Sequence, residues 1–422
     1  MHEMLMKSTL LTKNPNPDEV NRLQSCVFPC PGGQTGIRTL KINHIRLKNL
    51  LLIPVLIICL SMQAQNKRAA DYGIRFGVLN PGRNNAITDV PGVKVGHVTL
   101  KEGNAVNTGV TAILPHSGNI FQNKVPAGIF AGNGFGKLTG VSQVEELGNI
   151  ETPVILTNTL SVPVAAEALI DYTLGLPGNI TVMSVNPVVG ETNDAGLNDI
   201  RRRVITREHV LNAIAAADTG PVAEGNVGAG TGTVCFGFKG GIGTSSRILP
   251  ESKGGYTVGV LVQTNFGGIL RINGIPVGIE LGRHKFMKIT EKYKEDGSCM
   301  VVIMTDAPLD SRNLKRLAAR AMGGIAMTGG MTSNSSGDFA IAVSTAENLR
   351  IPWSAKSMYQ EMTVLRNEEM DLLFEAVIES TEEAIINSLF AAETVTGRYN
   401  FRIEALPVEK TLEILRKHNI IK

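Results

Sequence analysis

A charged loop meets a long apolar run at Gly297-Ser298, and this junction constrains the fold more than any other feature of the chain. Residues 291–296 (Glu-Lys-Tyr-Lys-Glu-Asp) offer almost nothing to bury, whereas residues 299–304 are continuously apolar and have the length of a core strand. The serine between them is open to two interpretations. It is the start of an ordinary strand, or it is a hidden N-terminus that self-cleavage exposes and that then serves as a catalytic nucleophile.

Composition describes a globular chain without the features of a nucleic-acid binder. With 422 residues, 43% of them hydrophobic and 19% charged, there is material for one large domain or two. Aromatic residues make up only 5% of the chain, which argues against base-stacking platforms. Residues 1–64 hold seven of the 41 basic and three of the 38 acidic residues, so the remaining 34 and 35 nearly balance. This part therefore has no basic field for nucleic acid or for a membrane surface.

Residues 1–64 are interpreted as a leader. Arg46-Leu47-Lys48, an apolar stretch at about 50–62 and then Gln63-Ala64 form the three-part pattern of a secretory signal. We expect cleavage after Ala64, export to the periplasm or the medium, and no stable membrane association afterwards; an uncleaved anchor is the alternative. The polar segment in front of this pattern leads us to expect the true translation start near Lys41.

No metal or cofactor site is expected. Three of the five cysteines lie in the leader, and Cys235 and Cys299 are predicted to be buried free thiols. The histidines have no zinc-type spacing. The glycine clusters at 132–137, 228–232 and 240–244 lack the P-loop and dinucleotide-binding patterns, so they are interpreted as turns and tight strand crossings.

Strand-like and helical segments interleave without a strict βαβ repeat, which predicts a layered α/β fold in a single catalytic domain over residues 65–422. Strand-like runs lie at 93–98, 109–114, 127–130, 153–157, 180–185, 227–238, 257–264, 300–305 and 338–344. Helical patterns lie at 162–174, 203–217, 310–322, 368–392 and 407–418.

Serine chemistry is possible here without a histidine. No Gly-x-Ser-x-Gly elbow is present, although a Ser-His-Asp arrangement stays open. A serine hydrolase without histidine needs another base, and the α-amino group of an N-terminal serine, with a reference pKa near 7.7–8.0, is one. Gly297 supplies the backbone freedom for the Ser298 hydroxyl to attack the preceding carbonyl and form an ester.

Two further segments carry polar groups beside strands. The hydroxyl-rich loop at 332–338 (Thr-Ser-Asn-Ser-Ser-Gly-Asp) enters an apolar strand, where catalytic groups are often displayed, although an ordinary turn has the same composition. Asn265 ends the run at 257–264, where its amide either stabilises an oxyanion or caps the strand.

Taken together, these segments resemble the family of L-aminopeptidase/D-esterases and β-peptidyl aminopeptidases, which are self-processing serine aminopeptidases. The ordered match covers nearly all of residues 70–400 and leaves out the leader. It is carried by segments 85–90, 95–97, 132–137, 157–162, 188–192, 228–232, 237–244, 262–267, 305–309 and 336–338.

The resemblance implies a four-layer αββα sandwich, similar to N-terminal nucleophile (Ntn) hydrolases but with different connectivity. It implies cleavage between Gly297 and Ser298 into an α chain, 65–297, and a β chain, 298–422, and assembly of αβ units into a homo-oligomer. It implies no metal and no cofactor.

The resemblance also implies roles for five residues. Ser298 is the nucleophile, Asn265 donates to the oxyanion, and Ser336 orients or polarises Ser298. Glu191, helped by Asp338, holds the free amine of the substrate. An ammonium group is what an aminopeptidase must recognise, so carboxylates near the nucleophile are expected on chemical grounds as well.

Asn193 departs from the pattern, because the best-known relatives carry an aromatic residue there. Asn193 is therefore a candidate substrate-binding residue, and the preference among L-, D- and β-amino acid residues stays open. The predicted function is removal of N-terminal amino acids from small peptides, amides or esters through an acyl-enzyme on Ser298. One alternative is a self-processing acyltransferase of the ornithine acetyltransferase type, which normally uses threonine; the other is a secreted binding protein with an inert version of the fold.

Overall fold

The computed structural model describes residues 68–287 and 297–422, and contacts group them into one compact unit. The predictions for residues 1–64 and for the charged loop at 291–296 lie outside the described residues. Within the described part, no helix is both long and apolar enough to cross a membrane.

The first sheet has four strands in the order β1-β2-β5-β6. β1 pairs antiparallel with β2 and β2 with β5, while β5 and β6 run parallel. The bounds are β1 (Lys94–Glu102), β2 (Val106–Leu114), β5 (Val154–Asn158) and β6 (Val188–Thr192).

The second sheet has the order β13-β3-β12-β11-β10-β9, with β4 pairing with β3. Its centre is the parallel pair β11 and β12, flanked by antiparallel neighbours. The bounds are β3 (Asn123–Gly134), β4 (Asn149–Ile150), β9 (Ile242–Ile248), β10 (Thr257–Asn265), β11 (Ser298–Thr305), β12 (Gly337–Ser344) and β13 (Ile351–Pro352).

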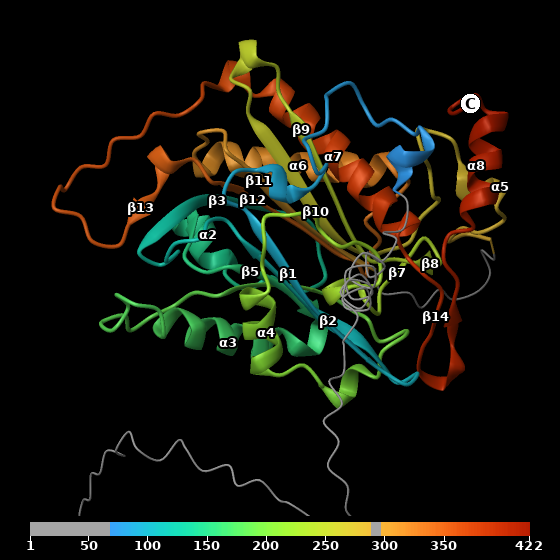
Figure 1. The fold of residues 1–422 in the computed structure, drawn as a ribbon, viewed down its shortest axis with the longest axis horizontal. Helices are drawn as coiled ribbons and strands as arrows, with labels where there is room; N and C mark the ends of the chain where they lie inside the picture. The colour runs from blue at the N-terminus through green and yellow to red at the C-terminus, as the bar shows by residue number, and fades with distance from the viewer. Residues whose placement is uncertain (1–67, 288–296) are drawn as a thin grey trace, which may run out of the picture. The chain divides into compact units, whose positions relative to one another are not determined.

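Helices cover the outer face of each sheet, as Figure 1 shows. α3 and α4 pack on the first sheet, and α6 and α7 pack on the second. The helix bounds are α2 (Val141–Leu147), α3 (Val162–Leu174), α4 (Arg207–Ala215), α5 (Val277–Glu280), α6 (Ser311–Met327), α7 (Asp371–Phe390) and α8 (Val408–Lys417). Two small hairpins complete the fold, β7 (Val234–Cys235) with β8 (Phe238–Lys239) and β14 (Val395–Thr396) with β15 (Arg402–Ile403).

Side-chain alternation along β11 explains why its sequence is continuously apolar. Cys299, Val301 and Ile303 belong to the core under α6 and α7. Met300 and Val302 belong to the core between the two sheets. A strand covered on both faces has no polar side, so the alternation of polarity seen in half-exposed strands is missing. The predicted layered α/β fold, helix–sheet–sheet–helix, is confirmed.

Several predicted helices and strands are confirmed, and two predicted strands are wrong. The helix at 162–174 has the predicted bounds, and Asp310 caps α6 by accepting the amide of Asn313 at 2.8 Å. The predicted strand at 180–185 is wrong: Ile180 is 92% exposed and no sheet edge pairs with this segment among the described residues. The run at 227–238 is not one strand either, because Gly228 and Phe236 have positive φ and break its extension.

The glycine clusters serve close approaches between elements, as predicted. A Cβ on Gly243 would lie 1.9 Å from the carbonyl oxygen of Ala384 in α7. A Cβ on Gly230 would lie 2.3 Å from the amide nitrogen of Ile242. Only glycine permits backbones to pack at these distances.

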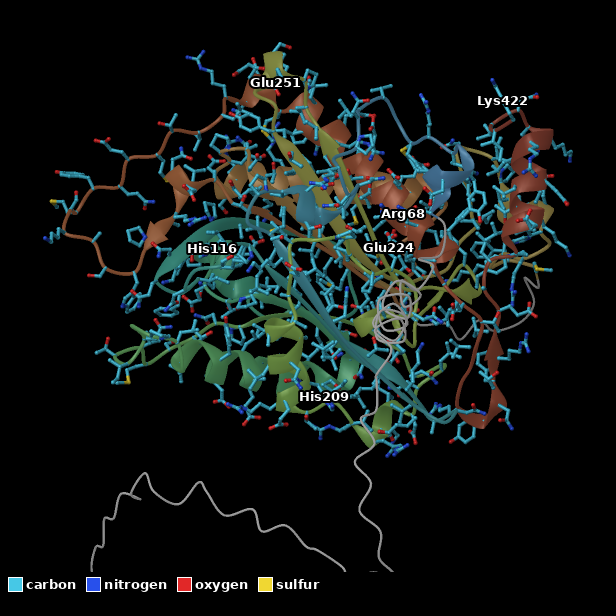
Figure 2. The ribbon with its side chains drawn as sticks, viewed as in Figure 1. Arg68, His116, His209, Glu224, Glu251 and Lys422 are labelled. Carbon is cyan, nitrogen blue, oxygen red and sulfur yellow. The ribbon has the colours of Figure 1, made fainter. Side chains whose placement is uncertain are left out.

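Buried ion pairs join segments from either side of Gly297. Arg247 of β9 pairs with Glu379 at 2.7 Å and with Glu383 at 2.8 Å, both on α7 and all buried. Arg68 pairs with Glu224 at 2.8 Å, a contact within the part of the chain before Gly297 (Figure 2). Removing one partner of a buried pair leaves an uncompensated charge, so the two Arg247 pairs hold α7 against β9.

Candidate active site

Ser298 is the first residue of β11 and lies between the ends of two neighbouring strands. It pairs with Asn265 of β10 on one side and with Gly337 of β12 on the other. Ser298 has the same alternation as Met300, which places its side chain toward the space between the sheets. Only 5% of Ser298 is exposed. The charged-to-apolar junction seen in the sequence is thus the entry of a central strand.

The carbonyl oxygen of Gly297, the residue before Ser298, accepts two hydrogen bonds. The Ser298 hydroxyl donates to it at 2.6 Å, and the backbone amide of Gly337 donates at 3.1 Å. The hydroxyl therefore lies beside the carbonyl group that it would attack. A backbone donor already placed at that oxygen is the arrangement that stabilises a developing oxyanion.

Ser336 and Asp338 lie at the start of β12, next to this peptide bond. The Ser336 hydroxyl donates to Asp338 Oδ1 at 2.8 Å, and both residues are buried. A Cβ on Gly297 would lie 3.3 Å from Ser336 Oγ. The register between β12 and β3 shifts between Asp338 and Phe339, and such irregularities re-aim side chains near active sites.

Burial dominates the electrostatics of Asp338. It raises the pKa of this carboxyl to about 6, against hydrogen bonds from the Ser336 hydroxyl and the Cys299 amide, which lower the pKa. Its second oxygen, Oδ2, is buried and has no hydrogen-bond partner in the described part of the chain. Asp338 is therefore poised to change protonation state slightly below neutral pH.

Asn265 is held by both ends of its side-chain amide. Its Oδ1 accepts the backbone amide of Val234 at 2.9 Å, and its Nδ2 donates to the carbonyl of Asn193 at 3.0 Å. The Val234 contact identifies the oxygen end of the amide, because an N–H can only donate. One hydrogen of Nδ2 remains to bind another acceptor next to Ser298.

Glu191 reaches the same place from the first sheet. Its carboxylate accepts the Lys137 amide at 3.1 Å and the Thr159 hydroxyl, and Lys137 Nζ lies 3.8 Å away. A Cβ on Gly136 would lie 3.3 Å from both Glu191 Oε1 and Gly337 Cα. This shared neighbour places the Glu191 carboxylate close to Gly337, whose amide donates to the Gly297 carbonyl.

Asn193 contributes its main-chain carbonyl to the site. Its carbonyl accepts from Asn265, while its side-chain Oδ1 accepts the amide of Ala195 at 3.0 Å and so belongs to its own loop. The fold thus brings the predicted site residues together around the start of β11, where Ser298 faces the space between the sheets and Asp338 follows the alternation of Ala340 on the helix-covered face. The predicted role of the Asn193 side chain in the substrate pocket stays a prediction.

The sequence did not allow us to predict several hydrogen-bond donors of the site, because the residue type does not show where a backbone amide points. The amides of Gly337 and Val234 are backbone groups, and only the strand pairing shows where they point. Thr159 lies in one of the matched segments, but nothing in its identity indicated a contact with Glu191. Cys235 and Cys299 are buried, as predicted, and neither forms a disulfide within the described residues.

The histidine and metal alternatives find no support in the described residues. His97 of β1 is half-buried and contacts Thr111 Oγ1 at 2.9 Å, and desolvation lowers its pKa to about 4, which favours the neutral imidazole. Among residues 68–287 and 297–422, no group of three or more His, Cys, Asp or Glu is placed to hold a metal ion.

Comparisons with known proteins agree with this arrangement. The model of peptidase family S58 matches residues 85–403. A β-peptidyl aminopeptidase from Sphingosinicella microcystinivorans is 43% identical over 378 residues, which covers 84% of this chain and 93% of the relative.

Two solved structures are similar over their full length. A β-aminopeptidase from Burkholderia sp. has a TM-score of 0.76 and 41% identity, and the match covers 83% of this chain and 99% of that one. An L-aminopeptidase D-Ala-esterase/amidase from Ochrobactrum anthropi has a TM-score of 0.76 and 36% identity, with 84% and 99% covered. The latter is described as a prototype of the serine aminopeptidases and a new variant of the Ntn hydrolase fold, which confirms the predicted fold class.

Proposed function

Because the chain belongs to peptidase family S58 and is a serine aminopeptidase, we propose that it cuts itself before Ser298 and then uses Ser298 as its nucleophile. The resemblance found in the sequence is confirmed by the family match. The observation that carries the proposal is the Ser298 hydroxyl at 2.6 Å from the Gly297 carbonyl oxygen, with the Gly337 amide on the same oxygen.

Self-cleavage proceeds in two steps. Ser298 Oγ attacks the Gly297 carbonyl carbon while its proton passes toward Ser336 and Asp338, and the oxyanion accepts from the Gly337 amide. The C–N bond then breaks, the Ser298 nitrogen takes up the proton, and Gly297 is left as an ester on Oγ. Water hydrolyses this ester to a Gly297 carboxylate and a free Ser298 amine.

The same hydroxyl then serves hydrolysis. The new α-amino group of Ser298 accepts the hydroxyl proton, and Oγ attacks the carbonyl of the N-terminal residue of the substrate. The amide of Asn265 donates to the oxyanion, the leaving group departs protonated, and water releases the amino acid from the acyl-enzyme.

Substrates are small peptides, amides or esters with a free N-terminal amine. Glu191 supports this class, because a buried carboxylate beside the nucleophile pairs with an ammonium group. The relatives of this chain include a β-peptidyl aminopeptidase and an L-aminopeptidase D-Ala-esterase/amidase, so substrates with β- and D-residues belong among those to be tried.

Export and assembly are part of the proposal. The leader pattern supports export, and the Arg247 pairs with Glu379 and Glu383 would keep the two pieces together after cleavage. Exposed apolar side chains such as Met183 and Met358, 91% and 87% exposed, support contacts between αβ units in a homo-oligomer.

The intact mass of the purified protein tests the proposal. Two fragments that meet at 297/298, with serine as the N-terminal residue of the second, support self-cleavage. A single uncut chain with full aminopeptidase activity overturns it.

Glu191→Gln is expected to raise KM for free-amine substrates by about tenfold or more, because a charge-assisted hydrogen bond contributes about 1.5–3 kcal/mol. Glutamine keeps the shape and the contact with the Lys137 amide. Esters with a blocked amine serve as the comparison and should show little change. Glu151→Gln, which alters a buried carboxylate paired with Lys124, is the matched control. Equal effects on both substrate types would remove the assigned role.

Self-cleavage is expected to slow as pH falls through about 6, because the carboxylate form of Asp338 accepts the Ser336 hydroxyl and the protonated form gives up that role. In the uncut chain the Ser298 nitrogen is an amide, so its own titration does not enter. The measurement is the cleavage rate of precursor refolded from denaturant between pH 4.5 and 8. Asp338→Asn should be slow and lack this pH limb; an unchanged limb in the variant contradicts the assignment.

A further inference from the structure

The orientation of the Asn265 amide depends on two backbone groups from separate segments. The Val234 amide on Oδ1 and the Asn193 carbonyl on Nδ2 hold the side chain at 2.9 and 3.0 Å. Each of these groups is next to a buried ionisable side chain to which the mechanism above assigns no role.

Lys239 lies beside the first of these groups. In the β7–β8 hairpin it is the cross-strand partner of Val234, and it is fully buried. Its Nζ donates at 2.9 Å to the carbonyl of Gly230, just before the hairpin, and at 2.9 Å to the carbonyl of Gly240, just after it. One ammonium group therefore ties together both ends of the hairpin that presents the Val234 amide.

Asp194 lies beside the second group, as the residue that follows Asn193. Its Oδ1 accepts Asn198 Nδ2 at 3.0 Å, and its main-chain carbonyl accepts the amides of Leu197 and Asn198 at 3.1 and 2.9 Å. Only 2% of the residue is exposed; burial raises the pKa of its carboxyl, against side-chain hydrogen bonds with Thr108 and Asn198 that lower it. The main-chain and side-chain contacts of Asp194 together close the turn that follows the Asn193 carbonyl.

The charge of Asp194 affects the pKa of Lys239. Burial lowers the pKa of Lys239 to about 7 and raises that of Asp194 to about 7, and the charge of Asp194 pulls the pKa of Lys239 back upward. The other titratable groups that act on the pair are Lys101 and Cys235 on Lys239, and Glu191 on Asp194. A buried charge is tolerated where another of opposite sign is near, so Asp194 favours the charged form of Lys239.

We propose that Lys239 and Asp194 are positioning residues that hold the two anchors of the Asn265 amide and so aim its free N–H at the oxyanion. The proposal rests on the proposed role of Asn265 in hydrolysis. Neither residue touches substrate; both act through the hairpin and the turn that contact Asn265.

Lys239→Met, which keeps the length of the side chain and removes the ammonium, is expected to lower kcat by about tenfold or more and leave KM within about twofold. The effect should stay below that of removing an oxyanion donor, which is about 10²–10³ in kcat. Lys124→Met is the matched control, because Lys124 is another buried lysine, paired with Glu151 at 3.6 Å, away from Ser298. It should lower the melting temperature without lowering kcat.

A double-mutant cycle separates positioning from a loss of stability. If Lys239 acts through Asn265, Lys239→Met should lower kcat little further in an Asn265→Ala background, because the amide that it aims is gone. If Lys239→Met does not fold, Asp194→Asn takes its place in the cycle, since it keeps the shape and the contact with Asn198. Three results would overturn the proposal: a fall in kcat by the same factor in both backgrounds, a parallel rise in KM, or an unchanged kcat.

Failure of the proposed function would look different. An uncut wild-type chain, or a Ser298→Ala variant with normal activity, would remove the mechanism itself. The variants of the cycle are expected to be cut normally, because the Gly297 carbonyl is contacted by Gly337 rather than by Asn265.

Discussion

Ser298→Ala is expected to leave one uncut chain and to lower aminopeptidase activity by at least about 10⁴-fold, since losing the nucleophile of a serine hydrolase costs about 10⁶ in kcat. Both losses would have one cause, because in the proposed mechanism the hydroxyl at 2.6 Å from the Gly297 oxygen is the group that attacks in self-cleavage and in hydrolysis. Intact mass and a denaturing gel measure the first loss, and release of an amino acid from a chromogenic amide measures the second.

Ser344→Ala is the matched control for this substitution. Ser344 is a fully buried serine at the opposite end of β12, where its hydroxyl donates to the Ala307 carbonyl at 2.7 Å. It should cost some stability while the chain is cut and active. A Ser298→Ala chain that is still cut at 297/298, or that keeps normal turnover, would contradict the central role given to this residue.

Asn265→Ala is expected to give a cut chain whose kcat is lower by about 10²–10³, with KM changed only a few-fold. The amide lies next to Ser298 across the β10–β11 pair, and its oxygen end is held by the Val234 amide. Because the amide is already held in place, it need not reorient when negative charge develops on the substrate oxygen. Its loss should therefore appear in turnover rather than in binding.

Steady-state kinetics on amide and ester substrates measure this effect. Asn226→Ala is the control, because Asn226 is also a buried amide, but its Nδ2 donates to the Glu393 carbonyl at 2.8 Å in another part of the fold. A rise in KM with unchanged kcat would assign Asn265 to substrate binding. A chain that stays uncut would assign it to self-cleavage as well, against the geometry at Gly297.

Elements whose burial pattern is visible in the chain could be predicted from it. Residues 257–264 have a Val- and Leu-rich centre and residues 300–305 are almost wholly apolar, and both form interior strands of the second sheet. The run at 180–185 has a similar composition but finds no neighbour, and Ile180 stays in solvent. A short apolar run shows that a segment is suitable for burial. Whether the segment is buried depends on a neighbouring strand with which it can pair.

The candidate site also has residues that could be predicted from the sequence and groups that could not. Ser298 could be singled out because a nucleophile at the boundary of a charged loop and an apolar run is visible locally, and the family resemblance named its partners. The Gly337 amide, the Val234 amide and the Asn193 carbonyl could not be predicted, because backbone groups are the same at every residue. Their direction depends on pairing and packing between segments; for the Gly337 amide it follows from the parallel register of β11 and β12.

The sequence by itself determined the layered α/β class, the family and the identity of the residues that carry charge or a hydroxyl at the site. Only the tertiary structure decided that Ser298 faces the space between two sheets, that Glu191 approaches it from the other sheet, and that Lys239 and Asp194 lie behind Asn265. The physical reason is that side-chain chemistry is local to a residue, whereas orientation, burial and pairing depend on contacts between segments far apart in the chain.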